Sequence, residues 1–209
     1  MYTLYGRPGS GSGACEAMLA LAGAPHEIVD LLKRPDGSLP DDIFRVNPLG
    51  QVPVLTLPDG TTMTESAAIC LYLADMFPEV GLAPASGDPD RAAYLRWMVY
   101  LAANIYMTDL RFFYPDRYTT EEAGASGVQE AAALRVAVEW TVFAEGLGDK
   151  PFILGSRLSA ADIYAAMLVS WVEPLDAFFA QHPNLAAHYR RVAAVPVIAD
   201  VWRRHGMPI

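Results

Sequence analysis

The sequence feature that most constrains the fold is a change in the spacing of apolar residues along the chain. Over residues 1–77, short runs rich in β-branched and aromatic residues alternate with segments of helical spacing, in the order strand, helix, strand, helix, strand, strand, helix. A strand–helix–strand unit followed by a hairpin predicts a small mixed sheet with helices packed on it. After residue 90 only helical spacing is found. The chain is therefore predicted to hold an α/β domain followed by an all-α domain.

The limits of the expected elements follow from proline, glycine and turn signals. In the first domain, the expected strands are YTLYG, HEIVDLL, VPVLTL and TTMT, and the expected helices are ACEAMLALAG, DDIFRVN and ESAAICLYLADMF. The residues PDG between the last two strands predict a hairpin turn. Residues 78–88 are rich in proline, glycine and small side chains, so they are interpreted as a linker between domains of residues 1–77 and 89–209. Helices are expected over residues 91–118, 120–146, 159–172, 184–194 and 196–205.

Composition narrows the class of protein. Hydrophobic residues make up 53% of the 209 residues and charged residues 19%, which is enough to bury a core and argues against disorder. The net charge of −9 argues against nucleic acid as a main partner. The N-terminal residues lack the pattern of a signal peptide, and no uncharged apolar run reaches the roughly 18 residues that a membrane helix needs. The two cysteines, Cys15 and Cys70, make no disulfide framework, so a reduced, cytoplasmic protein without a membrane partner is expected.

Pro53 stands between Val52 and Val54 at the start of the third expected strand. Proline has no N–H to donate to a neighbouring strand, so it is confined to edges and strand starts. One interpretation is that Pro53 merely begins an edge strand. The other is that the Val52–Pro53 peptide is cis, which would turn the N–H and C=O of Val52 outward to pair with an extended peptide ligand. The local sequence leaves both open.

The segment NPLGQVPVLTLPDGTTMTESAAICLYLAD, residues 47–75, resembles the glutathione-binding segment of the cytosolic glutathione transferases. That family shows an N-P-x-G-x-V-P-x-L stretch, a hairpin, and then E-S-x-A-I on a helix. The rest of the chain agrees in layout. The resemblance implies a thioredoxin-like α/β N-terminal domain, an all-α C-terminal domain with the electrophile pocket, glutathione as co-substrate, and a homodimer.

The resemblance also assigns residues to glutathione. Pro53 is implied to be the cis-proline of the thioredoxin-like fold, with the backbone of Val52 pairing with the cysteinyl part of the ligand. The N-terminus of the helix that begins near Glu65 and Ser66 suits an anion, because its N–H groups are free and its dipole is positive there. The implied anion is the γ-glutamyl carboxylate, with Glu65 facing the ligand ammonium. Further candidates for the glutathione site are Gln51, Lys33 and Arg34, of which the two basic residues could equally be solvated surface charges.

The group that activates the thiol is expected in the segment RPGSGSGACEA. A free thiol has a pKa of about 8.5, so an enzyme must stabilise its thiolate. The residues PGS resemble serine-type family members and favour Ser10. The residues SGAC resemble an S-x-P-C pattern and favour Ser12, although Ala14 replaces the proline, and GAC resembles bacterial members that use a cysteine, here Cys15. The serines could instead cap the helix, and Cys15 could be a small buried apolar residue.

The aromatic stretch of residues 100–118 is expected to supply the electrophile pocket, although core packing explains many of its aromatic residues equally well. The candidate pocket residues are Tyr106, Arg111 and Asn104. Ser159 and Asp162 fit a capping box, with Asp in place of the usual Glu or Gln, and are assigned to structure. The histidines show no ligand spacing, so no metal is predicted.

Two classes of function follow. The first is a glutathione transferase that activates the thiol for attack on small hydrophobic electrophiles. The second is a non-catalytic module that binds glutathione or another ligand. A glutathione-dependent thiol–disulfide reductase that uses Cys15 is a further alternative, which the lack of a C-x-x-C pair weakens.

Overall fold

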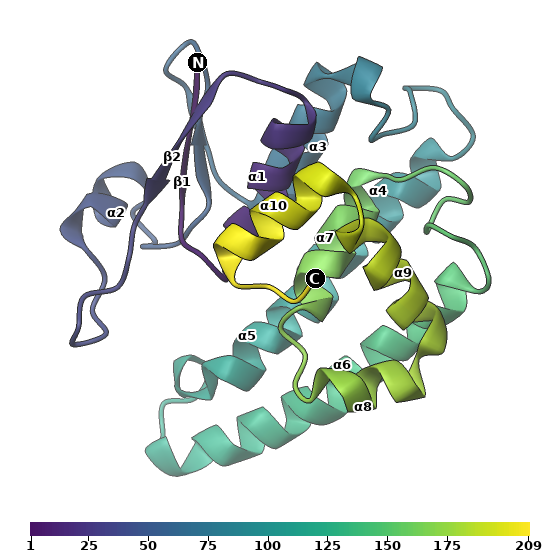
Figure 1. Cartoon of the computed structure of the whole chain (residues 1–209). Helices are drawn as coiled ribbons and strands as arrows, with labels where there is room; N and C mark the ends of the chain where they lie inside the picture. Colours follow the sequence, from purple (N-terminus) through teal and green to yellow (C-terminus); the bar gives the residue numbers. More distant parts are fainter.

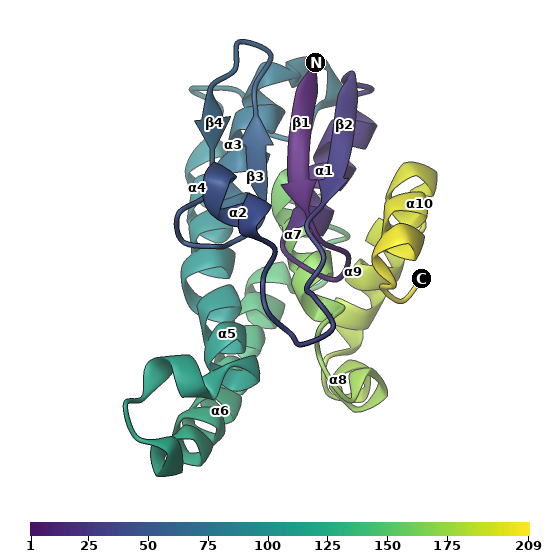
Figure 2. The ribbon, with the colours of Figure 1, turned by 90° about the vertical axis from the view of Figure 1, so that its left-hand side faces the viewer.

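The computed structural model describes residues 1–209. Its N-terminal part contains a four-stranded mixed sheet in the order β2-β1-β3-β4 (Figures 1 and 2). The strands are β1 (Tyr2–Gly6), β2 (His26–Asp30), β3 (Val54–Thr56) and β4 (Thr62–Met63). β1 runs parallel to β2 and antiparallel to β3, and β3 and β4 form the hairpin that the sequence predicts.

Three helices belong to this sheet. α1 (Ser12–Leu21) and α3 (Ser66–Met76) pack on the face that looks toward the rest of the molecule, while α2 (Asp41–Val46) lies on the other side (Figures 1 and 2). The predicted order of strands and helices in this part is therefore confirmed. The arrangement brings the N-termini of α1 and α3 together, since the two helices pack against each other beneath one sheet face.

Gly6, the last residue of β1, allows the chain to return tightly from the strand to the helix. A Cβ atom at this position would lie 2.6 Å from the Oγ atom of Ser12, which is shorter than any acceptable contact. Only glycine therefore permits the close approach of the strand end and the start of α1. This packing fixes where the loop between them lies.

The C-terminal part begins with one long helix. It consists of α4 (Arg91–Tyr100), the π-helical segment η2 (Leu101–Tyr106) and α5 (Met107–Phe113). The sequence predicts this helix to continue to residue 118, but it ends at Phe113. Pro115 explains the difference, because the residue before a proline is disfavoured in helical conformation. A short 3-10 turn, η3 (Pro115–Tyr118), follows.

The other helices are α6 (Ala125–Leu147), α7 (Ala160–Val169), α8 (Leu175–Gln181), α9 (Pro183–Ala193) and α10 (Pro196–His205), with the 3-10 turns η1 (Pro78–Val80) and η4 (Glu122–Gly124). The all-helical character predicted for this part is confirmed. The short α8 was not predicted, because seven residues after a proline give too little periodicity to identify a helix. None of the helices combines the length and apolar character needed to cross a bilayer.

The central helix α7 is buried along its whole length and packs against α1, α3 and α4. The predicted capping box at its start is present. Asp162 accepts hydrogen bonds from the N–H and Oγ of Ser159 at 2.9 and 2.6 Å, from the N–H of Ile153 at 2.8 Å, and from Nε2 of His188 at 2.8 Å. Asp162 therefore joins α9 and the preceding turn to α7, as well as capping the helix.

Candidate functional site

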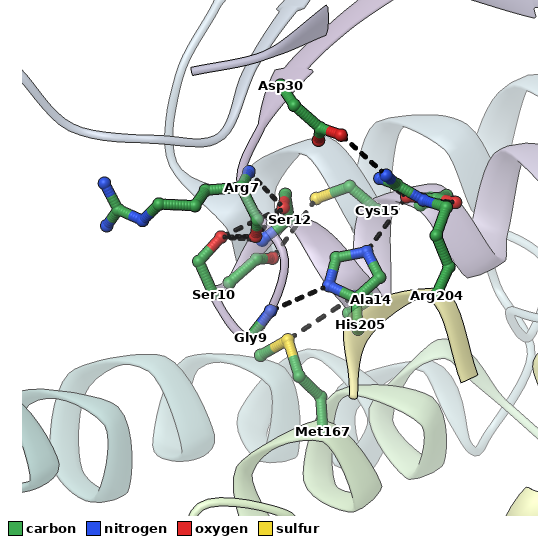
Figure 3. Close-up of polar contacts among 12 residues, drawn as sticks. Arg7, Gly9, Ser10, Ser12, Ala14, Cys15, Asp30, Met167, Arg204 and His205 are labelled. Carbon is green, nitrogen blue, oxygen red and sulfur yellow. Dashed lines mark hydrogen bonds and ion pairs between the residues drawn. The ribbon is translucent and has the colours of Figure 1, made fainter. Parts of the chain in front are cut away.

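The loop between β1 and α1 is held by two serine hydroxyls (Figure 3). The hydroxyl of Ser10 donates to the carbonyl of Arg7 at 2.6 Å, and the N–H of Arg7 donates to Ser12 Oγ at 3.1 Å. The two serine oxygens lie 2.9 Å apart. Ser12 is only 1% exposed, whereas Ser10 is partly open to solvent. Of the two predicted serines, Ser12 is an interior group of the loop and Ser10 is the one that a ligand can reach.

Cys15 lies one turn into α1 and has no exposed surface. Its Sγ atom is 3.5 Å from the carbonyl oxygen of Ser66 and 3.9 Å from Sγ of Cys70. Burial, together with Cys70, raises the pKa of the Cys15 thiol well above its ordinary value. A thiol that is protonated and inaccessible is a poor nucleophile. In this arrangement Cys15 ties the start of α1 to the start of α3.

The N-terminus of α3 is the second part of the candidate site. Glu65 is the only non-glycine residue with a positive φ, at 65°, a strained conformation of the kind that clusters at functional sites. Ser66 follows it, and its Oγ lies 2.7 Å from the hydroxyl of Tyr164 in α7. Burial raises the pKa of Tyr164, so this hydroxyl keeps its proton and can donate to Ser66. The proton of Ser66 is then free for another acceptor, and so are the first N–H groups of the helix.

The segment before β3 is the third part of the candidate site. The Val52–Pro53 peptide is cis, which confirms that alternative of the sequence analysis. Asn47 holds the preceding turn, because its Nδ2 donates to the carbonyl of Gln51 at 2.9 Å and its Oδ1 accepts from the N–H of Leu49 at 3.0 Å. Gln51 is exposed to solvent. β3 then pairs with β1, so this segment lies beside the strand that leads into the loop of Ser10.

Tyr106, at the end of the π-helical segment, reaches this junction from the C-terminal part. A Cβ atom at Gly11 would lie 2.6 Å from the Tyr106 hydroxyl, so the two groups are in close contact. The ring of Tyr106 also packs against Tyr164 and Trp171, with centroid distances of 6.3 and 5.2 Å. Burial raises the pKa of Tyr106, so its hydroxyl keeps its proton and can donate a hydrogen bond. Its position completes a site made from both parts of the chain.

The other two predicted pocket residues lie elsewhere on the same long helix. Nδ2 of Asn104 donates to the carbonyl of Tyr100 at 3.3 Å, within the helix. Arg111 is exposed and its guanidinium lies 5.4 Å from the ring centroid of Tyr118. It lines a hollow of about 440 Å³ between α5 and α6, with residues of α6 on the other side. The structure therefore brings Tyr106, but not these two residues, to the loop of Ser10.

The two predicted basic residues sit in the exposed chain that follows β2. Arg34 forms an ion pair with Asp41 at 3.1 Å. Lys33 extends toward the C-terminal part, where its Nζ lies 5.5 Å from the ring centroid of Tyr114. A third basic residue, Arg7, belongs to the loop of Ser10, and one buried nitrogen of its guanidinium has no partner in the chain. Lys33 and Arg7 are therefore the basic groups with donors still available near the junction.

Two aromatic residues of the site were not singled out from the sequence. Tyr164 bridges to Ser66, and Trp171 packs on Tyr106 with a buried indole N–H that has no acceptor in the chain. Both lie in or just after a helix whose spacing of apolar residues predicts only that they are buried. The one feature in the sequence that could have indicated a role in the site is their polar atoms, because a buried Tyr or Trp usually finds a hydrogen-bond partner.

Comparison with known proteins agrees with this architecture. Models of the N-terminal and C-terminal domains of glutathione S-transferases match residues 13–76 and 101–196. Two Escherichia coli proteins, the uncharacterized GST-like protein YncG and the glutathione S-transferase GstA, are each 31% identical to the chain over 98% of both sequences. A sphingomonad glutathione S-transferase, solved in complex with glutathione, is 31% identical with a TM-score of 0.82, covering 99% of this chain and 100% of that one.

The chain therefore belongs to the glutathione S-transferase family of enzymes. Its sheet and helices are the thioredoxin-like domain and the all-α domain of that family, as the sequence resemblance implied.

Proposed function

We propose that this protein is a glutathione transferase that binds glutathione at the junction of its two parts and activates the thiol for attack on small hydrophobic electrophiles. The observation that carries the proposal is the meeting of three groups at one point. These are the loop of Ser10, the N-terminus of α3 with its strained Glu65, and the hydroxyl of Tyr106. The sphingomonad relative with bound glutathione supports the choice of ligand.

The ligand backbone is assigned to groups that have unused hydrogen-bonding capacity. The N–H and C=O of Val52 pair with the cysteinyl part, since an extended peptide can add to the end of a sheet strand. Ser66 and the first N–H groups of α3 receive the γ-glutamyl carboxylate, favoured by the positive end of the helix dipole. Glu65 faces the ligand ammonium. Lys33 and Arg7 are the candidates for the glycine carboxylate.

The sulfur is assigned to Ser10 and the N–H of Gly11. In the free protein the Ser10 hydroxyl donates to the carbonyl of Arg7, and rotation about its Cα–Cβ bond turns the same proton toward the ligand sulfur. Hydrogen bonds to the thiolate stabilise the charged form and lower the thiol pKa. The thiol loses its proton to solvent, the thiolate sulfur forms a bond to the electrophilic carbon, and the leaving group departs with the electron pair of the bond that breaks. Tyr106 and Trp171 line the apolar side of this pocket.

The decisive experiment is a titration of glutathione bound to the wild-type protein, followed by thiolate absorbance against pH. We expect the thiol pKa to fall by about two units from its free value, since such shifts are common for groups that accept several hydrogen bonds in their charged form. Binding with an unshifted thiol pKa would instead make this chain a non-catalytic glutathione-binding module. A mixed disulfide with Cys15, detected by mass spectrometry, would favour the reductase alternative, which the complete burial of Cys15 opposes.

We also propose that the chain forms a homodimer through α4 and α6. Leu95 and Val99 of α4 and Leu134 and Val138 of α6 are large apolar side chains exposed to solvent, and Val99 and Leu134 are 59% and 69% exposed. A hydrogen bond from the hydroxyl of Tyr100 to the carbonyl of Glu139 links the two helices. Exposed apolar side chains gathered on two linked helices suit an interface, and a two-fold axis would cover them with a second copy of the chain.

Leu134→Glu should therefore convert a dimer to a monomer in sedimentation velocity, because it places a charge in the proposed interface. Leu32, an exposed leucine after β2 and outside these two helices, offers a matched control, and Leu32→Glu should stay dimeric. A wild-type protein that sediments as a monomer at micromolar concentration would refute the dimer.

A further inference from the structure

The C-terminal helix α10 lies beside α1 and ends against the loop that carries Ser10 (Figures 1 and 3). His205, its last residue, is almost fully buried. Its Nδ1 accepts a hydrogen bond from the N–H of Gly9 at 3.3 Å, and its Nε2 lies 2.9 Å from Oε2 of Glu16. The imidazole therefore links Gly9, the residue before Ser10, to Glu16 in the second turn of α1.

Glu16 anchors this link. Burial on its own would raise the pKa of Glu16, but hydrogen bonds from His205 and Arg204 outweigh it and hold the pKa below its ordinary value. Arg204 binds both carboxylate oxygens, with Nε 2.7 Å from Oε1, and its Nη1 reaches Asp30 at the end of β2, 2.9 Å away. A carboxylate that forms a bidentate ion pair with an arginine is a rigid hydrogen-bond acceptor, because two parallel hydrogen bonds fix its orientation.

The hydrogen bonds also define the state of the ring. Glu16 is a carboxylate and can only accept, so Nε2 of His205 must carry a proton. The N–H of Gly9 can only donate, so Nδ1 must be unprotonated. The tautomer with its proton on Nε2 therefore serves both partners. This is the arrangement by which a second hydrogen bond sets the role of each imidazole nitrogen.

We infer that His205 is a positioning residue for thiol activation, which holds the backbone of Gly9 so that Ser10 and the N–H of Gly11 face the ligand sulfur. The inference rests on the proposed function of this site. Gly9 has a φ of 71°, a conformation open to glycine, so the loop has little intrinsic preference for its shape and depends on such external contacts. Displacement of a reacting group by about 1 Å can cost about a hundredfold in rate.

Two substitutions separate the two hydrogen bonds of the ring. In His205→Asn, the amide oxygen can take the place of Nδ1 and still accept from Gly9, while the contact with Glu16 is lost. In His205→Gln, the amide nitrogen can take the place of Nε2 and still donate to Glu16, while the contact with Gly9 is lost. Arg203→Ala is the matched control, because Arg203 lies on the same helix and pairs only with exposed Asp200.

The test compares the thiol pKa of bound glutathione, kcat/KM toward a small electrophile, and the affinity for S-methylglutathione, which lacks the thiol. We expect His205→Gln to raise the thiol pKa by about one unit and lower kcat/KM by about tenfold to a hundredfold. His205→Asn should show a smaller rise in the thiol pKa and a smaller loss of kcat/KM than His205→Gln. Arg203→Ala should match wild type in both. The affinity for S-methylglutathione should change little in all three, which separates positioning of the sulfur from a general loss of binding.

A thiol pKa that stays at its wild-type value in His205→Gln would overturn the inference. A wild-type protein that does not lower the thiol pKa at all would refute the proposed function instead, so the two failures are distinguishable. The ¹⁵N shifts of His205 in the unmodified protein give a test that needs no variant to fold. Protonated Nε2 and unprotonated Nδ1 are expected, and the opposite tautomer would also overturn the inference.

Discussion

The substitution Ser10→Ala is expected to lower kcat/KM toward a small electrophile by about a hundredfold to a thousandfold, the range found when one donor to a developing anion is removed. Ser10 is the reachable hydroxyl of the loop, and the neighbouring Ser12 is buried. Loss of the Ser10 proton leaves the thiolate with backbone donors only, so the thiol pKa of bound glutathione should return toward its free value. Steady-state kinetics and thiolate absorbance measure the two effects.

Ser12→Ala and Cys15→Ala are the matched controls for this prediction. Ser12→Ala removes the acceptor of the Arg7 N–H, so it should cost about 1–3 kcal/mol of unfolding free energy through an unpaired group in the loop. Its effect on the thiol pKa should be smaller than that of Ser10→Ala. Cys15→Ala should leave the thiol pKa unchanged. The assignment of Ser10 would be wrong if either control restored the free thiol pKa while Ser10→Ala did not.

Asp109 of α5 should make the protein less stable as the pH rises, which is unusual for a carboxylate. It is only 7% exposed, and its Oδ2 has no hydrogen-bond partner in the chain. Burial and the charge of Glu139 on α6 raise the pKa of Asp109 to about 8. Between the unfolded pKa of about 4 and this value, the folded state holds a proton that the unfolded state has lost. Stability from this group is therefore fully present below about pH 4. It is lost progressively as the pH rises toward the folded pKa of about 8.

The substitution Asp109→Asn should remove this dependence, because an amide does not titrate. From pH 5 to pH 7 the wild type should lose about 1.4 kcal/mol of unfolding free energy per pH unit relative to the variant, the value for one proton. Urea unfolding at several pH values measures the difference. Glu130→Gln, at an exposed position of α6, should run parallel to wild type. Parallel curves for Asp109→Asn and wild type would contradict the prediction.

Both predictions depend on contacts that the sequence does not reveal. Ser10, Ser12 and Cys15 lie within six residues and share the same local signals, so spacing and composition cannot rank them. Their difference is one of burial, which comes from the packing of α1 against β1 and α3. Asp109 likewise lies in a helix whose sequence gives no sign that it is buried. Its raised pKa comes from the packing of α5 on α6 and from the neighbouring Glu139.

The sequence by itself determined the order of strands and helices, the hairpin, the capping box of Ser159 and Asp162, and the family. These signals are local, because periodicity, turn residues and caps act over a few neighbouring positions. Helix ends were less well determined, as at Pro115, and the short α8 gave no signal. The two alternatives for Val52–Pro53 could not be separated, because the preference between cis and trans is small and the surrounding fold decides it.

Only the tertiary structure decided how distant segments complete the site. Ser66 and Tyr164 are 98 residues apart and share a hydrogen bond, and Gly9 and His205 are 196 residues apart and share another. In the sequence His205 is a lone histidine and Glu16 a polar residue in an apolar helix. Their roles arise because α10 packs against α1 and buries the polar atoms of both side chains. No pattern of neighbouring residues encodes that long-range contact.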